Sequence, residues 1–409
     1  MNTAPSILAA LSTSLAFEPQ GAVAGNLTVG RGTLDGRAVR VALVEGRFAS
    51  GAVGAVEAER LVALLKVASL ERAPLVLYLD SAGAKVSEGL RALGAFRALF
   101  RAALDVRAAG VPVAAVLGKN CYGGSSMLAH VAGRRLFSPG TQLAMSGPAI
   151  LAAQAGMNAL DEMFRAMAEA AISPAARAQA SAANTVWDGG DPGPWLREAL
   201  GAPAGEARAL HEALGRRLGN PAAAPLEPVQ RRDLERIYPE GYAARETHGL
   251  LAGEGRRDGA VEPFVGLVAR KPVGAERAWR FADHVWQLVA SPPERLEVFL
   301  DSATHAAKLE DEKVVLSEYI VGMSLALDHL ARAGTQVGLT ILGQAGGGVY
   351  VALAAPARRV TSLYGADIQV LPGAAVAAIL GESRETTPAF GDYRAAGVAD
   401  DELKLGFVP

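Results

Sequence analysis

Short runs of consecutive apolar residues alternate along most of the chain with longer segments whose apolar residues recur every three to four positions. The runs 75–80 and 296–301 are typical of buried strands, and each ends in an aspartate. Apolar residues at helical spacing follow both runs, over about 90–104 and 315–330. Strands that alternate with helices in this way predict right-handed βαβ units and a parallel sheet.

The same succession of signals occurs twice. A second strand, at 111–117 in the first half and at 337–342 in the second, runs into a cluster of glycines. The clusters at 123–124 and 346–348 each open an apolar, alanine-rich helix. The pattern therefore predicts a tandem duplication of an α/β domain, with one parallel sheet in each half.

Between the two halves, the composition shifts toward Gly, Pro, Ala and Arg. We therefore expect an N-terminal domain over 1–187, a linker with helical pieces over 188–258, and a C-terminal domain over 259–409. A length of 409 residues has room for two such domains.

Composition excludes several classes of function. The formal net charge is −2, without the basic excess that nucleic-acid binding requires. The single cysteine excludes an intramolecular disulfide framework and any multi-cysteine metal site. The first 17 residues contain no Lys or Arg, and no apolar run approaches the roughly 18 residues of a spanning helix. We expect a cytoplasmic protein that binds neither nucleic acid nor membrane.

The glycine clusters suggest a chemistry. A strand that turns through glycines into a helix leaves free backbone N–H groups at the helix N-terminus, where they form an oxyanion hole or a phosphate cradle. Neither cluster ends in the Lys-Ser/Thr of a P-loop, and neither is followed by the acidic residue of a dinucleotide fingerprint. The chain also lacks a Gly-x-Ser-x-Gly elbow, which argues against a serine hydrolase.

Two stretches of the first half carry a family resemblance. Residues 80–89, Asp-Ser-Ala-Gly-Ala-Lys-Val-Ser-Glu-Gly, resemble the carboxyltransferase signature of biotin-dependent acyl-CoA carboxylases. Residues 143–156 resemble the beta subunit of biotin-independent malonate decarboxylase, and residues 262–381 resemble its gamma subunit. The chain thus resembles these two subunits fused into one.

This resemblance implies two tandem crotonase-like domains of the ClpP superfamily, each a ββα-superhelix built from βαβ units. Three positions depart from the family pattern: Lys85 stands where Arg is usual, Ser146 where the decarboxylase branch usually has Asn, and Ala149 where it usually has Glu.

The activity implied is decarboxylation of a malonyl thioester to an acetyl thioester, without biotin, through an enolate held by backbone N–H groups. The catalytic candidates are the residues of the two glycine turns: Gly123, Gly124, Ser125, Gly346, Gly347 and Gly348. The candidates for substrate binding are Ser81, Ala82, Gly83, Ser146, Gly147, His305, Pro372 and Gly373. One turn would hold the thioester oxygen and the other the carboxylate.

No metal and no bound cofactor is expected. The acyl group would be carried on the phosphopantetheine-type thiol of coenzyme A or of an acyl carrier protein. The resemblance also implies at least a homodimer, whose cleft forms where an N-terminal half meets a C-terminal half, within one chain or across two. Two alternatives stay open: a biotin-dependent acyl-CoA carboxyltransferase, and a scaffold without activity that binds a carrier protein.

Other residues near the predicted turns have plainer interpretations. We expect Cys121 to be a small buried turn residue, because no histidine base is evident beside it. Asp80 and Asp301 are expected to anchor loops by accepting backbone N–H groups. For His130, which falls within an apolar helix, a core position is expected.

Overall fold

The computed structural model describes residues 6–156, 161–222, 225–302, 304–371, 376 and 387–404. The chain divides into two compact units. The first unit comprises Met1–Glu88, Ala98–Gly205 and Ala307–Ser317, and the second comprises Gly89–Arg97, Glu206–Ala306 and Glu318–Pro409. Each unit therefore includes one short segment from the opposite half of the sequence.

The first unit contains one sheet with the strand order β1-β2-β3-β4-β5-β6-β8, to which β7 adds by pairing with β5. Strands β1 to β3 pair antiparallel, and all pairs from β3 to β8 are parallel. The strands are β1 (Glu18–Pro19), β2 (Leu27–Leu34), β3 (Arg37–Val44), β4 (Leu75–Ser81), β5 (Val113–Tyr122), β6 (Arg134–Phe137), β7 (Gln142–Ala144) and β8 (Asn184–Val186).

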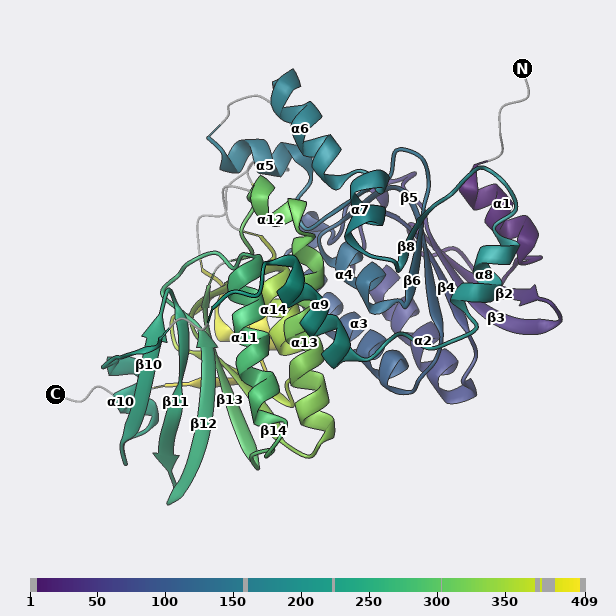
Figure 1. Cartoon of the computed structure of the whole chain (residues 1–409). Helices are drawn as coiled ribbons and strands as arrows, with labels where there is room; N and C mark the ends of the chain where they lie inside the picture. The colour runs from purple at the N-terminus through teal and green to yellow at the C-terminus, as the bar shows by residue number, and fades with distance from the viewer. Residues whose placement is uncertain are drawn as a thin grey trace. The chain divides into compact units, whose positions relative to one another are not determined.

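Helices cover both faces of this sheet. On one face, α1 and α8 join a core cluster with alternate residues of β3, β4 and β5, and they lie together in Figure 1. Helix α2 contacts β3, and α4 contacts β4 and β5. Neither helix contributes to the core cluster of α1 and α8, so the two helices cover the opposite face, toward which the other alternate residues of these strands point. The helices are α1 (Ile7–Ser14), α2 (Ala55–Glu71), α3 (Leu90–Ala108), α4 (Gly124–Val131), α5 (Pro148–Gln154), α6 (Glu162–Ile172), α7 (Pro174–Ala180), α8 (Gly193–Ala199) and α12 (Leu309–Lys313).

The second unit repeats this plan with the order β17-β15-β14-β13-β12-β11-β10-β9, to which β16 adds by pairing with β14. Strands β9 to β12 pair antiparallel, and the pairs from β12 onward are parallel. The strands are β9 (Glu227–Pro228), β10 (Tyr242–Thr247), β11 (Leu250–Arg257), β12 (Ala260–Leu267), β13 (Arg295–Ser302), β14 (Gln336–Gly346), β15 (Arg359–Leu363), β16 (Asp367–Gln369) and β17 (Asp401–Leu403).

Strands β12, β13, β14 and β15 follow one another in order across the second sheet. Right-handed crossovers therefore place their connecting helices on one face, where Figure 1 shows α11 and α13 along the strands. The helices of this unit are α9 (Ala207–Arg217), α10 (Arg232–Ile237), α11 (Ala275–Leu288), α13 (Leu316–Arg332), α14 (Gly347–Ala354) and α16 (Phe390–Ala395). The predicted α/β fold with a duplicated parallel sheet is confirmed.

The segment expected to be a linker with helical pieces contains helices and also strands that were not predicted from the sequence. Strands β10 and β11 lie within residues 188–258 and pair with β12 of the second sheet. Two tight turns join these three strands, His248-Gly249 and Asp258-Gly259, and all four residues have positive φ. Such turns are typical of two-residue hairpins. Helix α8, from the same segment, packs in the core of the first unit.

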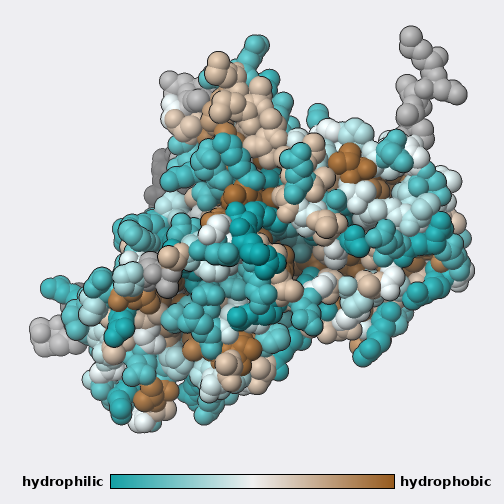
Figure 2. Space-filling model, viewed as in Figure 1, coloured by the Kyte–Doolittle hydropathy of each residue, from teal (hydrophilic) through white to brown (hydrophobic). Residues whose placement is uncertain are grey.

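Helix α6 leaves an apolar face uncovered. It buries Ala168 and Ile172, whereas Met163 and Met167 are exposed. Figure 2 shows apolar residues gathered over α5 and α6, on a face that is otherwise largely hydrophilic. Within the described residues, none of the helices is long and apolar enough to cross a membrane.

An aromatic cluster forms part of the core of the second unit. The rings of Tyr238, Phe264 and Phe299 lie with centroids 5.4 to 6.2 Å apart, and α10 packs on them through Leu234 and Ile237. These pairs have the stacked and edge-to-face geometry that aromatic side chains favour.

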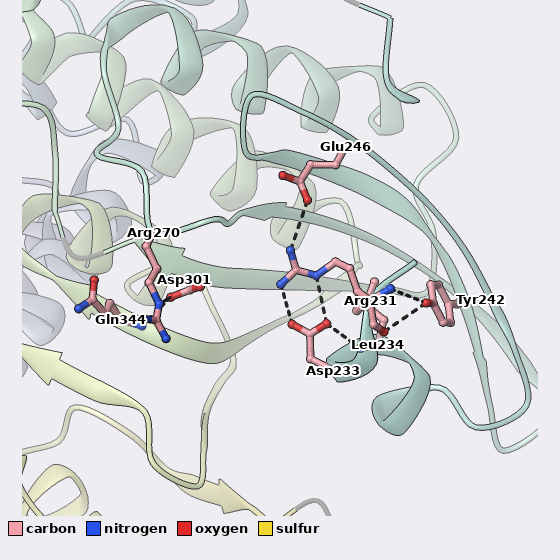
Figure 3. Close-up of polar contacts among 8 residues, drawn as sticks. All are labelled: Arg231, Asp233, Leu234, Tyr242, Glu246, Arg270, Asp301 and Gln344. Carbon is pink, nitrogen blue, oxygen red and sulfur yellow. Dashed lines mark hydrogen bonds and ion pairs between the residues drawn. The ribbon is translucent and has the colours of Figure 1, made fainter. Parts of the chain in front are cut away.

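The start of α10 is fixed by a polar network (Figure 3). The Arg231 guanidinium donates to Asp233 and to Glu246 of β10, and the Arg231 N–H donates to the Tyr242 hydroxyl at 2.8 Å. The helix that covers the aromatic cluster is thereby tied to the edge of the sheet.

The aromatic cluster generates a stability prediction. Phe299→Ala should lower the free energy of unfolding by about 3–5 kcal/mol, because it leaves a cavity beneath two other rings. Val261→Ala is the matched control on β12: Val261 is 51% exposed, and its truncation should change stability by less than about 0.5 kcal/mol. Urea unfolding followed by circular dichroism measures both, and equal effects would contradict the assigned core.

Candidate functional site

The first glycine turn joins β5 directly to α4. Gly123 lies between them with φ 53° and ψ −127°, a conformation that side chains rarely adopt. Its N–H donates to the carbonyl of Ala144 at 3.1 Å, which ties the turn to the end of β7. Helix α4 begins at Gly124 and continues through Ser125, so their N–H groups belong to the first turn of the helix, where no intrahelical acceptor exists.

A second loop of the first unit contacts this turn through a pair of buried hydroxyls. The Ser125 hydroxyl donates to the Ser81 hydroxyl at 2.7 Å, and the Gly83 N–H donates to the same Ser81 oxygen at 3.1 Å. The Ala82 N–H donates to the carbonyl of Ser50. A Cβ on Gly83 would lie 2.8 Å from the Tyr122 carbonyl oxygen, so only glycine fits there. The structure thus brings together the predicted residues at 81–83 and 123–125.

The predicted residues Ser146 and Gly147 lie between β7 and α5. Ser146 is fully buried, and its N–H donates to the Glu312 carboxylate at 2.8 Å. Gly147 precedes Pro148, the first residue of α5, and a Cβ on Gly147 would lie 3.3 Å from the Tyr122 ring. Both residues therefore lie close to the end of β5, from which the first glycine turn emerges.

The second glycine turn joins β14 to α14 in the same way. Gly346 pairs with Gln369 of β16, and Gly347 follows with φ 54° as the first residue of the helix, before Gly348. A Cβ on Gly347 would lie 3.2 Å from the Thr304 hydroxyl and 3.8 Å from His305 Nδ1. His305 therefore lies beside this turn. Pro372 and Gly373 fall outside the described residues.

The aspartates at the ends of β4 and β13 anchor the neighbouring strands. Asp80 accepts the N–H of Asn120 at 2.9 Å, and Asp301 accepts the N–H of Gln344 at 2.8 Å. Figure 3 shows Asp301 between Gln344 and Arg270, whose Nε lies 3.8 Å from the carboxylate. Both aspartates accept backbone N–H groups as predicted, but the groups belong to the strands β5 and β14 and not to loops.

Burial sets the protonation of two candidate groups. Cys121 is fully buried, and burial raises the pKa of its thiol far above neutrality, so a reactive thiolate does not form there. Burial lowers the pKa of His305 to about 4, so its imidazole is neutral near pH 7. The Thr304 hydroxyl lies 3.2 Å from His305 Nδ1, within hydrogen-bond distance. His130 is buried, as expected.

Glu312 and Arg177 were not predicted from the sequence. Both side chains are fully buried, and the Arg177 Nη2 lies 3.7 Å from the Glu312 Oε2. Glu312 belongs to the run Leu309–Lys313, whose acidic composition is typical of an exposed helix, so no local signal marked it. Within the described residues, no group of three or more His, Cys, Asp and Glu side chains is arranged to hold a metal ion.

The burial of His305 generates a prediction. Its folded-state pKa lies below the ordinary value of 6.5, so its contribution to folding stability should be lost as pH falls from about 6.5 toward 4. In NMR titrations, the resonance of the His305 imidazole is the one that is absent from a His305→Gln variant. This imidazole should stay neutral down to about pH 4. The unfolding free energy of the wild type should fall relative to His305→Gln over the same range. Titration near pH 6.5 would contradict the buried environment.

Each half of the chain matches the model of a known protein family. Residues 8–168 match the carboxyl transferase domain, and residues 268–393 match the malonate decarboxylase gamma subunit. The chain is similar to the acetyl-coenzyme A carboxylase carboxyl transferase subunit beta of Synechococcus sp. (strain JA-3-3Ab). These are 31% identical over 137 residues, which are 33% of this chain and 44% of that protein.

A second relative is the methylmalonyl-CoA carboxyltransferase 12S subunit of Propionibacterium freudenreichii subsp. shermanii, 28% identical over 152 residues, which are 37% of this chain and 29% of that protein. The chain thus spans less than half the length of either relative. A solved structure of a Pseudomonas malonate decarboxylase hetero-tetramer in complex with malonate aligns with 49% of this chain and 76% of its own, at 24% identity and a TM-score of 0.44. The two family matches confirm the predicted resemblance: residues 8–168 match the carboxyl transferase domain, and residues 268–393 of the same chain match the malonate decarboxylase gamma subunit.

Proposed function

We propose that this protein decarboxylates a malonyl thioester to an acetyl thioester without biotin. The observation that carries the proposal is the fusion itself, in which a carboxyl transferase domain precedes a domain matched by the malonate decarboxylase gamma subunit. Each half also has a glycine turn that opens a helix, at Gly123 and at Gly347.

The reaction needs only donors for developing negative charge. The bond between the carboxylate carbon and the α-carbon breaks, carbon dioxide leaves, and the electron pair moves through the α-carbon onto the thioester oxygen. A proton then adds to the α-carbon. Backbone N–H groups fixed at a helix N-terminus stabilise such an oxyanion without reorganising as the charge forms. The chain has two such turns, and the substrate has two groups, thioester and carboxylate, whose oxygens need donors.

The substrate would be carried on a phosphopantetheine-type thiol, either of coenzyme A or of an acyl carrier protein. His305 would serve as a neutral donor beside Gly347, because burial holds its pKa at about 4. The residues at 81–83 and 146–147 would contact substrate near the first turn, and Pro372 and Gly373 near the second. The expected homodimer stays a prediction.

The first functional prediction concerns turnover without biotin. Purified protein given malonyl-coenzyme A or malonyl-acyl carrier protein should release carbon dioxide and yield the acetyl thioester in equal amounts. Intact mass spectrometry of the carrier would show a loss of about 44 Da, the mass of the carbon dioxide that leaves in a decarboxylation. Added avidin should not change the rate.

A biotin-dependent acyl-CoA carboxyltransferase is the second candidate, favoured by the curated relatives of the first half. For that reaction, turnover would require carboxybiotin and an acyl-CoA, and malonyl thioester alone would be stable. Binding of the carrier without turnover under either condition would instead support a scaffold.

The second functional prediction tests the glycine turns. Gly123→Ala and Gly347→Ala should each lower kcat by about 10²–10³, the loss expected for one misplaced oxyanion donor. Both positions have φ near 54°, so an added Cβ strains the turn and reorients its N–H groups. Steady-state kinetics on folded variants measure the loss.

Matched controls exist in each unit. Gly110 precedes β5 and Gly334 precedes β14, both with positive φ and with open space around a Cβ. Gly110→Ala and Gly334→Ala also place a side chain at a positive φ, but at the opposite ends of the same strands, and they should retain near-normal kcat. Cys121→Ala should also stay active. If the controls lose as much activity as the turn variants, the loss reflects folding and the assigned role of the turns is wrong.

A further inference from the structure

The first unit contains a buried ion pair whose partners come from opposite halves of the sequence. Arg177 belongs to α7, and Glu312 belongs to α12, which lies within the segment Ala307–Ser317 of the same unit. Both side chains are fully inaccessible to solvent. Taking two charges out of water is costly, so a buried pair of this kind is weak evidence of a stabilising role.

The contacts of this pair converge on one short segment, Leu143–Gly147. The Ser146 N–H donates to the Glu312 Oε1 at 2.8 Å, and Arg177 Nε donates to the carbonyl of Leu143 at 2.9 Å. Arg177 Nη1 also donates to the backbone carbonyl of Glu312 at 2.7 Å, which fixes the end of α12 against α7. The ion pair therefore holds the segment at Leu143 and at Ser146.

The same segment supports the first glycine turn. Between Leu143 and Ser146, the carbonyl of Ala144 accepts the N–H of Gly123 at 3.1 Å. A chain of direct hydrogen bonds and one covalent segment thus runs from the Glu312 carboxylate to the glycine turn. If Ser146 moves because its acceptor is removed, the Ala144 carbonyl two residues earlier should move too, and with it the Gly123 N–H that donates to this carbonyl.

We propose that Glu312 is a positioning residue, which orients the first glycine turn by accepting the N–H of Ser146 while paired with Arg177. The expected effect on kcat rests on the proposed function, whereas the expected effect on the geometry of the segment Leu143–Gly147 does not. It makes residues 307–317 a necessary part of the site in the first unit, although they follow that unit's sheet in sequence by more than a hundred residues.

The charges that face Glu312 set the pH range of its effect. Burial raises its pKa to about 7, while Arg177 of α7 and the backbone N–H groups of Ser146 and Met145 lower it. Asp311 of α12 raises the pKa of Glu312. Tyr122 of β5 also faces Glu312, and its own pKa is raised first by burial and further by Glu169 of α6 and by Glu312. The carboxylate form, which accepts from Ser146 and pairs with Arg177, therefore predominates only above about pH 7.

The experiment compares Glu312→Ala, Glu312→Gln and the control Glu310→Gln, in which an exposed carboxylate of the same helix is changed. Hydrogen exchange by mass spectrometry should show faster exchange of Leu143–Gly147 in Glu312→Ala, by about 10-fold or more. Exchange in β3 and β4 should stay unchanged. Glu312→Gln keeps an oxygen acceptor and should restore most of the protection, and Glu310→Gln should match the wild type.

The kinetic arm uses the malonyl thioester assay. Glu312→Ala should lower kcat by about 10²-fold with little change in KM, as a displaced catalytic turn requires. Glu312→Gln should recover at least a tenth of the wild-type kcat and lack the rise in kcat near pH 7 that is expected of the wild type.

The two arms separate the possible failures. Unchanged exchange of Leu143–Gly147 in Glu312→Ala overturns the positioning role, whatever the activity. Faster exchange throughout the first unit, with kcat falling only in proportion to the folded fraction, reduces Glu312 to a stabilising residue and also overturns the proposal. A wild type that does not decarboxylate the substrate refutes the proposed function, while the exchange result still decides the structural part.

Discussion

The carboxylate at the end of the second parallel strand fixes the course of the strand beside it in both units. Asp80 lies over Gly118, where a Cβ would approach the Asp80 Cβ to 2.5 Å, and Asp301 lies over Gly343 in the same way. Asp80 accepts the N–H of Asn120 and Asp301 accepts that of Gln344, and the pairing register shifts at these points. Strands β5 and β14 thereby change partner part of the way along, and the freed ends lead into the glycine turns.

The duplication preserves this framework and varies the side chains on it. Beside Gly123 lie two serine hydroxyls in contact with each other, whereas beside Gly347 lie Thr304 and a neutral His305. The first turn thus has hydroxyl groups that can both donate and accept, and the second has an imidazole that burial keeps uncharged. The backbone groups are equivalent in the two units, whereas the side chains beside the two turns differ in chemistry.

Local patterns were sufficient to predict the strands β4, β5, β13 and β14 and the glycine turns that follow two of them, because these features depend on residues close in sequence. The hairpin of β10 and β11 was missed because its glycines and charged residues resemble those of a linker, and only pairing with β12 makes them a sheet. Glu312 could not be recognised because its burial depends on Arg177, which lies 135 positions earlier. Long-range partners of this kind leave no periodicity in the sequence.

The exchange of short segments between the units has a consequence for synthesis of the protein. The first sheet is complete once residue 205 has been made, yet its unit also requires Ala307–Ser317. At roughly 5–20 residues per second, those residues leave the ribosome about 5–20 seconds later. During that interval, the nascent first unit lacks the Glu312 carboxylate that later accepts the Ser146 N–H and lies beside Arg177. The contacts of Glu312 with Ser146 and Arg177 are therefore made well after the strands of the first sheet have been synthesised.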